Sequence, residues 1–184
     1  YNTKKTIKYY WEEMKRHKKV GSLLVVSTVI ATIIDAIIPL YFKDFFNVLA
    51  GNETREVIVK GLLSILLIIG ILKLLEWVFR RISAFSLNYF EARLIADLSK
   101  KCFSYVHQHS FNFFSNNFTG SIVKKVKSFV RSFEVLADQL FWELLPAFIT
   151  MSIITFILAR VNLFLGLGML AWIIIFLAIN WIFT

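Results

Sequence analysis

The feature that most constrains this chain is a set of apolar stretches too long and too poor in charge for a water-soluble fold. No charged residue occurs from Val161 to Thr184, and Asp35 is the sole charge between Gly21 and Phe42. A helix needs about 20 consecutive apolar residues to cross the hydrocarbon of a bilayer. The hydrophobic fraction is 58%, above the roughly 45–50% of ordinary soluble domains. The sequence therefore predicts an all-α membrane protein.

The apolar stretches predict four membrane spans. Their approximate bounds are 21–49, 58–79, 140–160 and 161–184. A charge inside a span costs at least a few kcal/mol, so Asp35 is expected to face the bundle interior or a watery cavity. It is either a contact on a translocation path or a packing group near the outer end of span one. Lys73 and Glu76 are three apart in span two and are interpreted as a structural intramembrane pair.

The distribution of Lys and Arg predicts the orientation, since basic residues are retained on the cytoplasmic side. Seven precede span one and nine lie between Arg80 and Arg131, whereas the connection 50–59 has only Arg55. The N-terminus and residues 80–139 are therefore expected in the cytoplasm, in a plasma or inner membrane. Residues 1–20 are predicted to form an amphipathic elbow helix along the inner surface.

The segment 80–139 is predicted to be a helical hairpin rather than a loop. No Gly or Pro occurs between Gly70 and Gly120, so span two has no reason to stop before about His109 and would project roughly 45 Å from the membrane. A polar cluster at 110–120 then turns the chain back. Apolar side chains at helical spacing predict packing stripes on both arms: Ile82, Phe85, Leu87, Phe90, Leu94, Leu98, Phe103, Val106, Ile122, Val126, Phe129, Val130, Phe133 and Leu136. Arg93 and Asp97, four apart, are expected to support the first arm as an exposed pair.

This arrangement resembles the first half of the type I transmembrane domain of ATP-binding-cassette (ABC) exporters. The likeness covers nearly the whole chain and rests on Arg93-Leu94, Lys100-Lys101, Phe113-Phe114 and Gly120 in the family's order and spacing. The sequence departs from the family where an Arg and, four residues later, an Asp commonly follow the Gly. Here Lys125 and Phe129 occupy those positions.

The resemblance implies that the turn 111–121 is a coupling element that docks on a nucleotide-binding domain. Exposed aromatic anchors carry much of the energy of such interfaces. The residues expected in this contact are Phe111, Phe113, Phe114, Asn117 and Gly120. The alternative is a hairpin tip that packs on itself.

ATP chemistry is not expected in this chain, because the sequence has no Gly-x-x-x-x-Gly-Lys-Ser/Thr phosphate loop. The resemblance places ATP and Mg²⁺ on a nucleotide-binding domain encoded in the same gene or on a separate chain. It also implies a second transmembrane half, as a homodimer or a heterodimer. The sequence has four of the family's six spans and begins with Tyr1 in place of Met. Both features are expected of a fragment.

Other functions fit the residues less well. The net charge of +9 follows from basic cytoplasmic segments, so nucleic acid is not expected as a partner. Cys102 stands alone, and His107 and His109 point to different sides of a helix, so no metal site is expected. A membrane-embedded enzyme would need clustered His and Asp residues within the spans.

The main rival to an exporter is a membrane scaffold whose hairpin recruits a soluble partner. The substrate stays open, as does glycosylation of Asn52 in the sequon Asn52-Glu53-Thr54.

Overall fold

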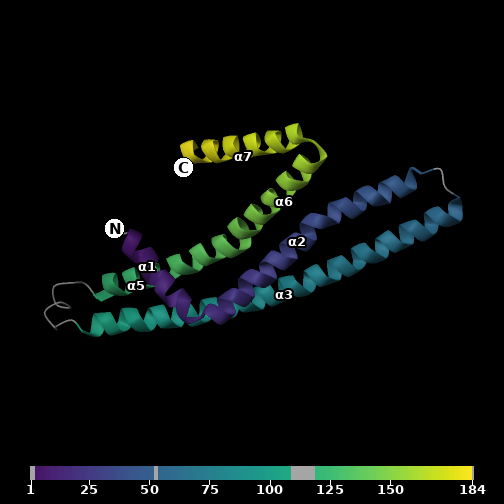
Figure 1. The fold of residues 1–184 in the computed structure, drawn as a ribbon. Coiled ribbons are helices and arrows are strands. Elements are labelled where there is room, and N and C mark those ends of the chain that lie inside the picture. Colours follow the sequence, from purple (N-terminus) through teal and green to yellow (C-terminus); the bar gives the residue numbers. More distant parts are fainter. Residues whose placement is uncertain (1–2, 52–53, 109–118, 184) are drawn as a thin grey trace. The chain divides into compact units, whose positions relative to one another are not determined.

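The computed structural model describes residues 3–51, 54–108 and 119–183, and all regular structure in these ranges is helical. The all-α prediction is confirmed (Figure 1). The elements are α1 (Thr3–Arg16), α2 (Lys18–Leu49), α3 (Arg55–His107), α5 (Thr119–Asp138), the π-helical segment η1 (Gln139–Leu144), α6 (Leu145–Val161) and α7 (Leu163–Phe183).

Three helices are long and apolar enough to cross a membrane. They are α2, α3 and the continuous helical stretch Gly120–Val161, and Leu163–Ile179 is a shorter apolar helix within the searched part of the chain. This shorter helix, Leu163–Ile179, lies in the predicted fourth span. Helix α3 runs without a break through 53 residues, as expected from the absence of Gly and Pro over most of its length.

The chain divides into two compact units. Unit 1 contains Tyr1–Thr28 and Phe79–Leu144, and unit 2 contains Val29–Val78 and Leu145–Thr184. Helices α2 and α3 each contribute residues to both units.

The core of unit 1 forms around one stripe of α3. Leu87, Phe90, Leu94 and Leu98 follow one another at spacings of three and four, and all are buried. The expected stripe was too wide, since Phe85 is 73% exposed and Phe103 is 57% exposed. Phe85 is two residues from buried Leu87, and Phe103 is five residues from buried Leu98. At 100° per residue, each ring lies about 140–160° around the helix from that buried residue.

The core is completed by residues of α1, α2, α5 and η1. They are Tyr10, Leu24, Phe133, Ala137 and Phe141. Phe141 meets Phe90 edge to face, with ring centroids 6.2 Å apart, a favoured geometry for aromatic pairs. On α5, Phe133 is buried as expected, but the next buried residue is Ala137 and not the expected Leu136, which is 50% exposed.

Small residues allow α2 and α3 to approach closely within unit 1. A Cβ added at Gly21 would lie 3.3 Å from the Phe90 ring. About two turns further along α2, the hydroxyl oxygens of Thr28 and Ser83 are 2.6 Å apart, and both residues are buried. Small and hydroxylated residues serve the same purpose between membrane helices in general.

A local change of helix type follows from Pro146. Proline has no N–H to donate to the carbonyl four residues earlier, so the regular α-helical ladder is interrupted at the start of α6. The six residues of η1 end at Leu144, two positions before this proline. Such π-helical segments accommodate an interrupted ladder without ending the helix, and η1 places Phe141 in the core of unit 1.

In unit 2, α7 turns back on α6 at Asn162 (Figure 1). The Asn162 side-chain oxygen accepts a hydrogen bond of 2.9 Å from the Phe164 amide, which caps the start of α7. Four residues on, the helices meet without a gap: a Cβ at Gly166 would lie 2.6 Å from the Ala159 Cβ and 2.8 Å from its Cα. Only glycine fits this contact without displacing a backbone.

Replacing Gly166 by Ala is expected to destabilise the α6–α7 contact by about 1–3 kcal/mol, the usual cost of overpacking. The added methyl group meets backbone and Cβ atoms, which have no flexible end to move aside. Thermal unfolding of the chain in detergent, followed by circular dichroism, measures the effect. Gly168→Ala is the matched control, because nothing lies within 4 Å of a Cβ there. Equal stability of the two variants would contradict the described approach.

Candidate functional site

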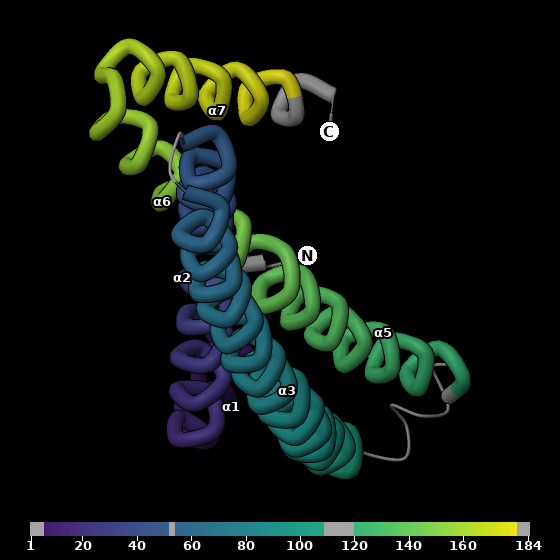
Figure 2. The backbone as a smooth tube through the Cα atoms, turned by 90° about the vertical axis from the view of Figure 1, so that its right-hand side faces the viewer, coloured from purple at the N-terminus to yellow at the C-terminus, as the bar shows by residue number. Residues whose placement is uncertain are grey.

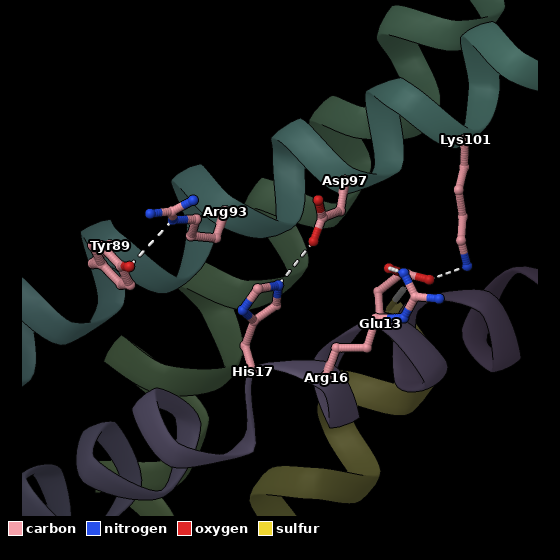
Figure 3. Close-up of polar contacts among 7 residues, drawn as sticks. All are labelled: Glu13, Arg16, His17, Tyr89, Arg93, Asp97 and Lys101. Carbon is pink, nitrogen blue, oxygen red and sulfur yellow. Dashed lines mark hydrogen bonds and ion pairs between the residues drawn. The ribbon is translucent and has the colours of Figure 1, made fainter.

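The largest group of polar contacts drawn in unit 1 is a junction between α1 and α3 (Figure 3). Glu13 and Asp97 each contact a side chain from the other side of the junction. Lys101 Nζ donates to Glu13 Oε1, and His17 Nε2 lies 2.8 Å from Asp97 Oδ2. Glu13 precedes His17 in the chain, whereas its partner Lys101 follows Asp97. The two segments therefore run antiparallel to each other. In Figure 2, α1 lies beside the teal part of α3.

Glu13 is the residue on which this junction depends. Its side chain is only 1% exposed, and besides Lys101 it has Arg16 as a cation, with Nη1 3.4 Å from Oε2. A buried carboxylate is costly unless cations compensate it. Lys101 therefore holds α1 in one register against α3, while Arg16 compensates the same carboxylate from within α1.

A second contact ties α1 to α5. The Tyr10 hydroxyl donates a 2.7 Å hydrogen bond to the carbonyl of Phe129. Its ring packs against Phe129 and Phe133, with centroids 5.0 and 5.2 Å away. Burial raises the pKa of the Tyr10 phenol. Helix α1 thus contacts both α3 and α5, the two arms of the predicted hairpin.

Arg93 and Asp97 are directed to other partners than the sequence analysis expected. Asp97 binds His17, and Arg93 Nε donates to the Tyr89 hydroxyl at 3.2 Å while its guanidinium lies 5.2 Å from the Tyr89 ring centroid. The hydrogen bond from His17 holds the pKa of Asp97 below its usual range. An exposed pair on one helix gains little, so the cross-helix contact of Asp97 replaces it.

Sequence reasoning missed the junction residues Tyr10, Glu13 and His17. A signal was nevertheless present, since Glu13 and His17 are four apart, as are Asp97 and Lys101. Residues four apart lie on the same face of a helix, so each pair could meet the other across two neighbouring helices. Without knowledge of which helices meet, many other pairs would match equally well.

Glu91 occupies a different face of α3, opposite two acidic residues of α5. Burial, together with the charges of Asp138 and Glu134, raises its pKa to about 7. Its Oε1 is buried and has no hydrogen bond among the described residues. This carboxyl can therefore take up or release a proton near neutral pH.

In unit 2, the structure brings Asp35, Lys73 and Glu76 together. Lys73 Nζ lies 2.9 Å from Asp35 Oδ1 and 2.7 Å from Glu76 Oε2. The sequence analysis treated Asp35 separately, whereas one ammonium group here serves two carboxylates from α2 and α3. The contacts with Lys73 lower the cost of all three charges in a membrane.

The expected coupling residues lie mostly outside the described part of the chain. This applies to Phe111, Phe113, Phe114 and Asn117. Gly120 is in the first turn of α5 and is exposed. Over the ranges that the structure describes, no three His, Cys, Asp or Glu side chains are grouped so as to hold a metal ion.

Comparison with known proteins gives one result. A protein-family model described as the ABC transporter transmembrane region matches residues 22–184. No curated protein matches the sequence. The matched range begins in the first turns of α2 and includes every later helix, while α1 precedes it.

Lys101→Met is expected to destabilise unit 1 by about 1–3 kcal/mol, because it removes one of two cations from a buried carboxylate. Thermal unfolding in detergent measures the change. Lys100→Met, which removes the same charge from a neighbouring exposed position, should stay within about 0.5 kcal/mol of wild type. Adding Glu13→Gln to Lys101→Met should recover part of the loss. If Lys101→Met were as stable as Lys100→Met, the described contact between Lys101 and Glu13 would be contradicted.

Glu91 is expected to make stability fall as pH rises toward neutral. Its folded pKa of about 7 lies above the ordinary value of 4.5, so the folded state holds the proton more tightly. The resulting stabilisation is complete below about pH 4.5 and is lost as the pH rises through about 7. Glu91→Gln should flatten the pH dependence of the unfolding temperature in this window, and Glu134→Gln should reduce it less. A pH profile unchanged by Glu91→Gln would refute this assignment.

Proposed function

We propose that this chain, which belongs to the ABC transporter transmembrane family, forms the membrane-spanning part of an ATP-driven exporter. The observation that carries the proposal is the unbroken course of α3 from Arg55 to His107. Its first part is the apolar candidate span, and its later part bears Arg93, Asp97 and Lys101 in polar contacts with neighbours. Such a change along one helix fits a span that continues into the cytoplasm.

In this proposal, the arms α3 and α5 carry movement between a nucleotide-binding domain and the spans. The turn 111–121 docks on that domain, which supplies ATP and Mg²⁺ from the same gene or a separate chain. Helix α1 supports the proposal because it contacts both arms, through Tyr10 on one side and Glu13 on the other. Arms held together by a common helix would move as one body when the turn is displaced.

The translocation path would be shared with a second transmembrane half. Asp35 is the residue of this chain proposed to face that path. Lys73 Nζ lies 2.9 Å from its carboxylate, so the ammonium would offset the charge of Asp35 at the wall of the path. The identity of the transported compound depends on spans beyond this chain.

The proposal is tested first by topology. In a background with Cys102→Ser, single cysteines replace Asn116 and Asn162, and a membrane-impermeant maleimide is added to sealed vesicles of either orientation. We expect Asn116→Cys to react from the cytoplasmic side only and Asn162→Cys from the opposite side only. Reaction of Asn116→Cys from outside would refute the cytoplasmic hairpin.

Coupling is tested by crosslinking Asn116→Cys to the nucleotide-binding domain with and without ATP. Replacing Phe113 and Phe114 by Ala should weaken this association about tenfold or more, as expected when aromatic anchors are lost from an interface. Phe85→Ala is the matched control, because Phe85 is an exposed ring elsewhere on α3. A crosslinked partner without ATPase activity would favour the scaffold alternative over the exporter.

A further inference from the structure

An apolar groove of about 390 Å³ opens in unit 1, next to the point where α1 meets α2. Phe90 and Phe141 line it together with Val25 and Val26 of α2. Phe90 is 1% exposed and is held by its edge-to-face contact with Phe141 and by the close approach of Gly21. The groove is therefore preformed, and its volume lies within the roughly 300–1,000 Å³ typical of ligand sites.

Two lysines, Lys15 and Lys18, also line this groove. Two other cations of α1 have acidic partners, since Lys8 pairs with Glu12 and Arg16 with Glu13. Within the described ranges, neither groove lysine forms an ion pair. Lys15 lies over the Trp11 ring, with Nζ 5.6 Å from the centroid, and Trp11 lines the groove as well.

The groove also lies where a membrane interface is expected. Lys18 is the first residue of α2, a candidate span, and Val25 and Val26 follow it two turns further along. Trp and Lys are typical of the headgroup level, and apolar side chains of the hydrocarbon below it. Lys15 and Lys18 line the groove through their aliphatic stems, and such stems allow the charged heads to reach the headgroup level at the rim of an apolar wall.

We propose that this groove binds one anionic phospholipid of the inner leaflet. Lys15 and Lys18 contact the phosphate and headgroup, and one acyl chain lies along Val25 and Val26 above the two phenylalanine rings. The charge complementarity selects the ligand, since two lysines without carboxylate partners favour an anion and the walls favour a hydrocarbon tail. This binding requires only that the chain sits in a membrane, so it is independent of the proposed exporter function.

Native mass spectrometry of the intact chain in mild detergent tests the proposal. The protein is equilibrated with equal amounts of phosphatidylglycerol and phosphatidylcholine that carry identical acyl chains, and bound lipid is counted. Wild type should retain one phosphatidylglycerol in preference to phosphatidylcholine. Replacing Lys15 and Lys18 by Gln should weaken this retention roughly ten- to thirtyfold, at about a factor of five per lysine.

The matched control replaces Lys8 and Lys19 by Gln, which removes the same charge outside the groove. It should retain phosphatidylglycerol within about twofold of wild type, because a diffuse surface field contributes little beside a local site. Ser22→Trp, which fills the groove from an exposed lining position, should abolish retention of both lipids while leaving the unfolding temperature of the chain nearly unchanged.

Three results would overturn the proposal. Equal losses in the Lys15/Lys18 and Lys8/Lys19 variants would mean diffuse attraction to the basic surface. Full lipid retention by a folded Ser22→Trp variant would place the lipid elsewhere. A wild-type chain that retains no lipid and forms dimers that Ser22→Trp dissociates would mean that a second copy occupies the groove. None of these outcomes bears on the topology or the nucleotide-binding-domain crosslink.

Discussion

The buried carboxylate of Glu13 is the interaction on which unit 1 depends. An ionised group that is 1% exposed needs compensation at close range, and Arg16 and Lys101 provide it from α1 itself and from α3. This requirement sets the position of α1, and with it the Tyr10 hydrogen bond to the α5 backbone. An apolar residue at position 13 would pack without selecting a register. The charge therefore specifies how the helices meet more than it adds to their stability.

The bilayer imposes the second constraint, because a backbone that crosses hydrocarbon must satisfy its own hydrogen bonds. This is why the described residues form long helices even through prolines. Pro39 lies inside α2, and the chain stays helical from η1 through Pro146 into α6. Exposed apolar side chains on α6 and α7 have the same origin, since lipid and neighbouring spans are their expected surroundings. The close contact at Gly166 shows how helices associate there without a hydrophobic driving force.

The sequence predicted the helical membrane fold, the length of α3 and the family, because each depends on properties of contiguous residues. Apolar length, the absence of Gly and Pro, and motif spacing are all local. The partners of Asp97 and Asp35 were not predicted, because His17 and Lys73 come from other helices and many pairings satisfy the same charge pattern. Phe85 was assigned to the core for a related reason: its apolar character does not reveal which side of α3 the neighbouring helices cover. The predicted coupling residues Phe113 and Phe114 stay a prediction.

Helix α1 combines two kinds of contact in 14 residues. Glu13 and Tyr10 face α3 and α5, whereas Lys15 and Trp11 face the groove proposed to hold a lipid. If a lipid binds only when α1 is docked, the lipid must favour docking by the same factor by which docking favours the lipid. Anionic lipid in the inner leaflet would then act on the helix that holds both arms of the hairpin together. The composition of the membrane would thereby influence how firmly the two arms are joined, without any contact between the lipid and the turn.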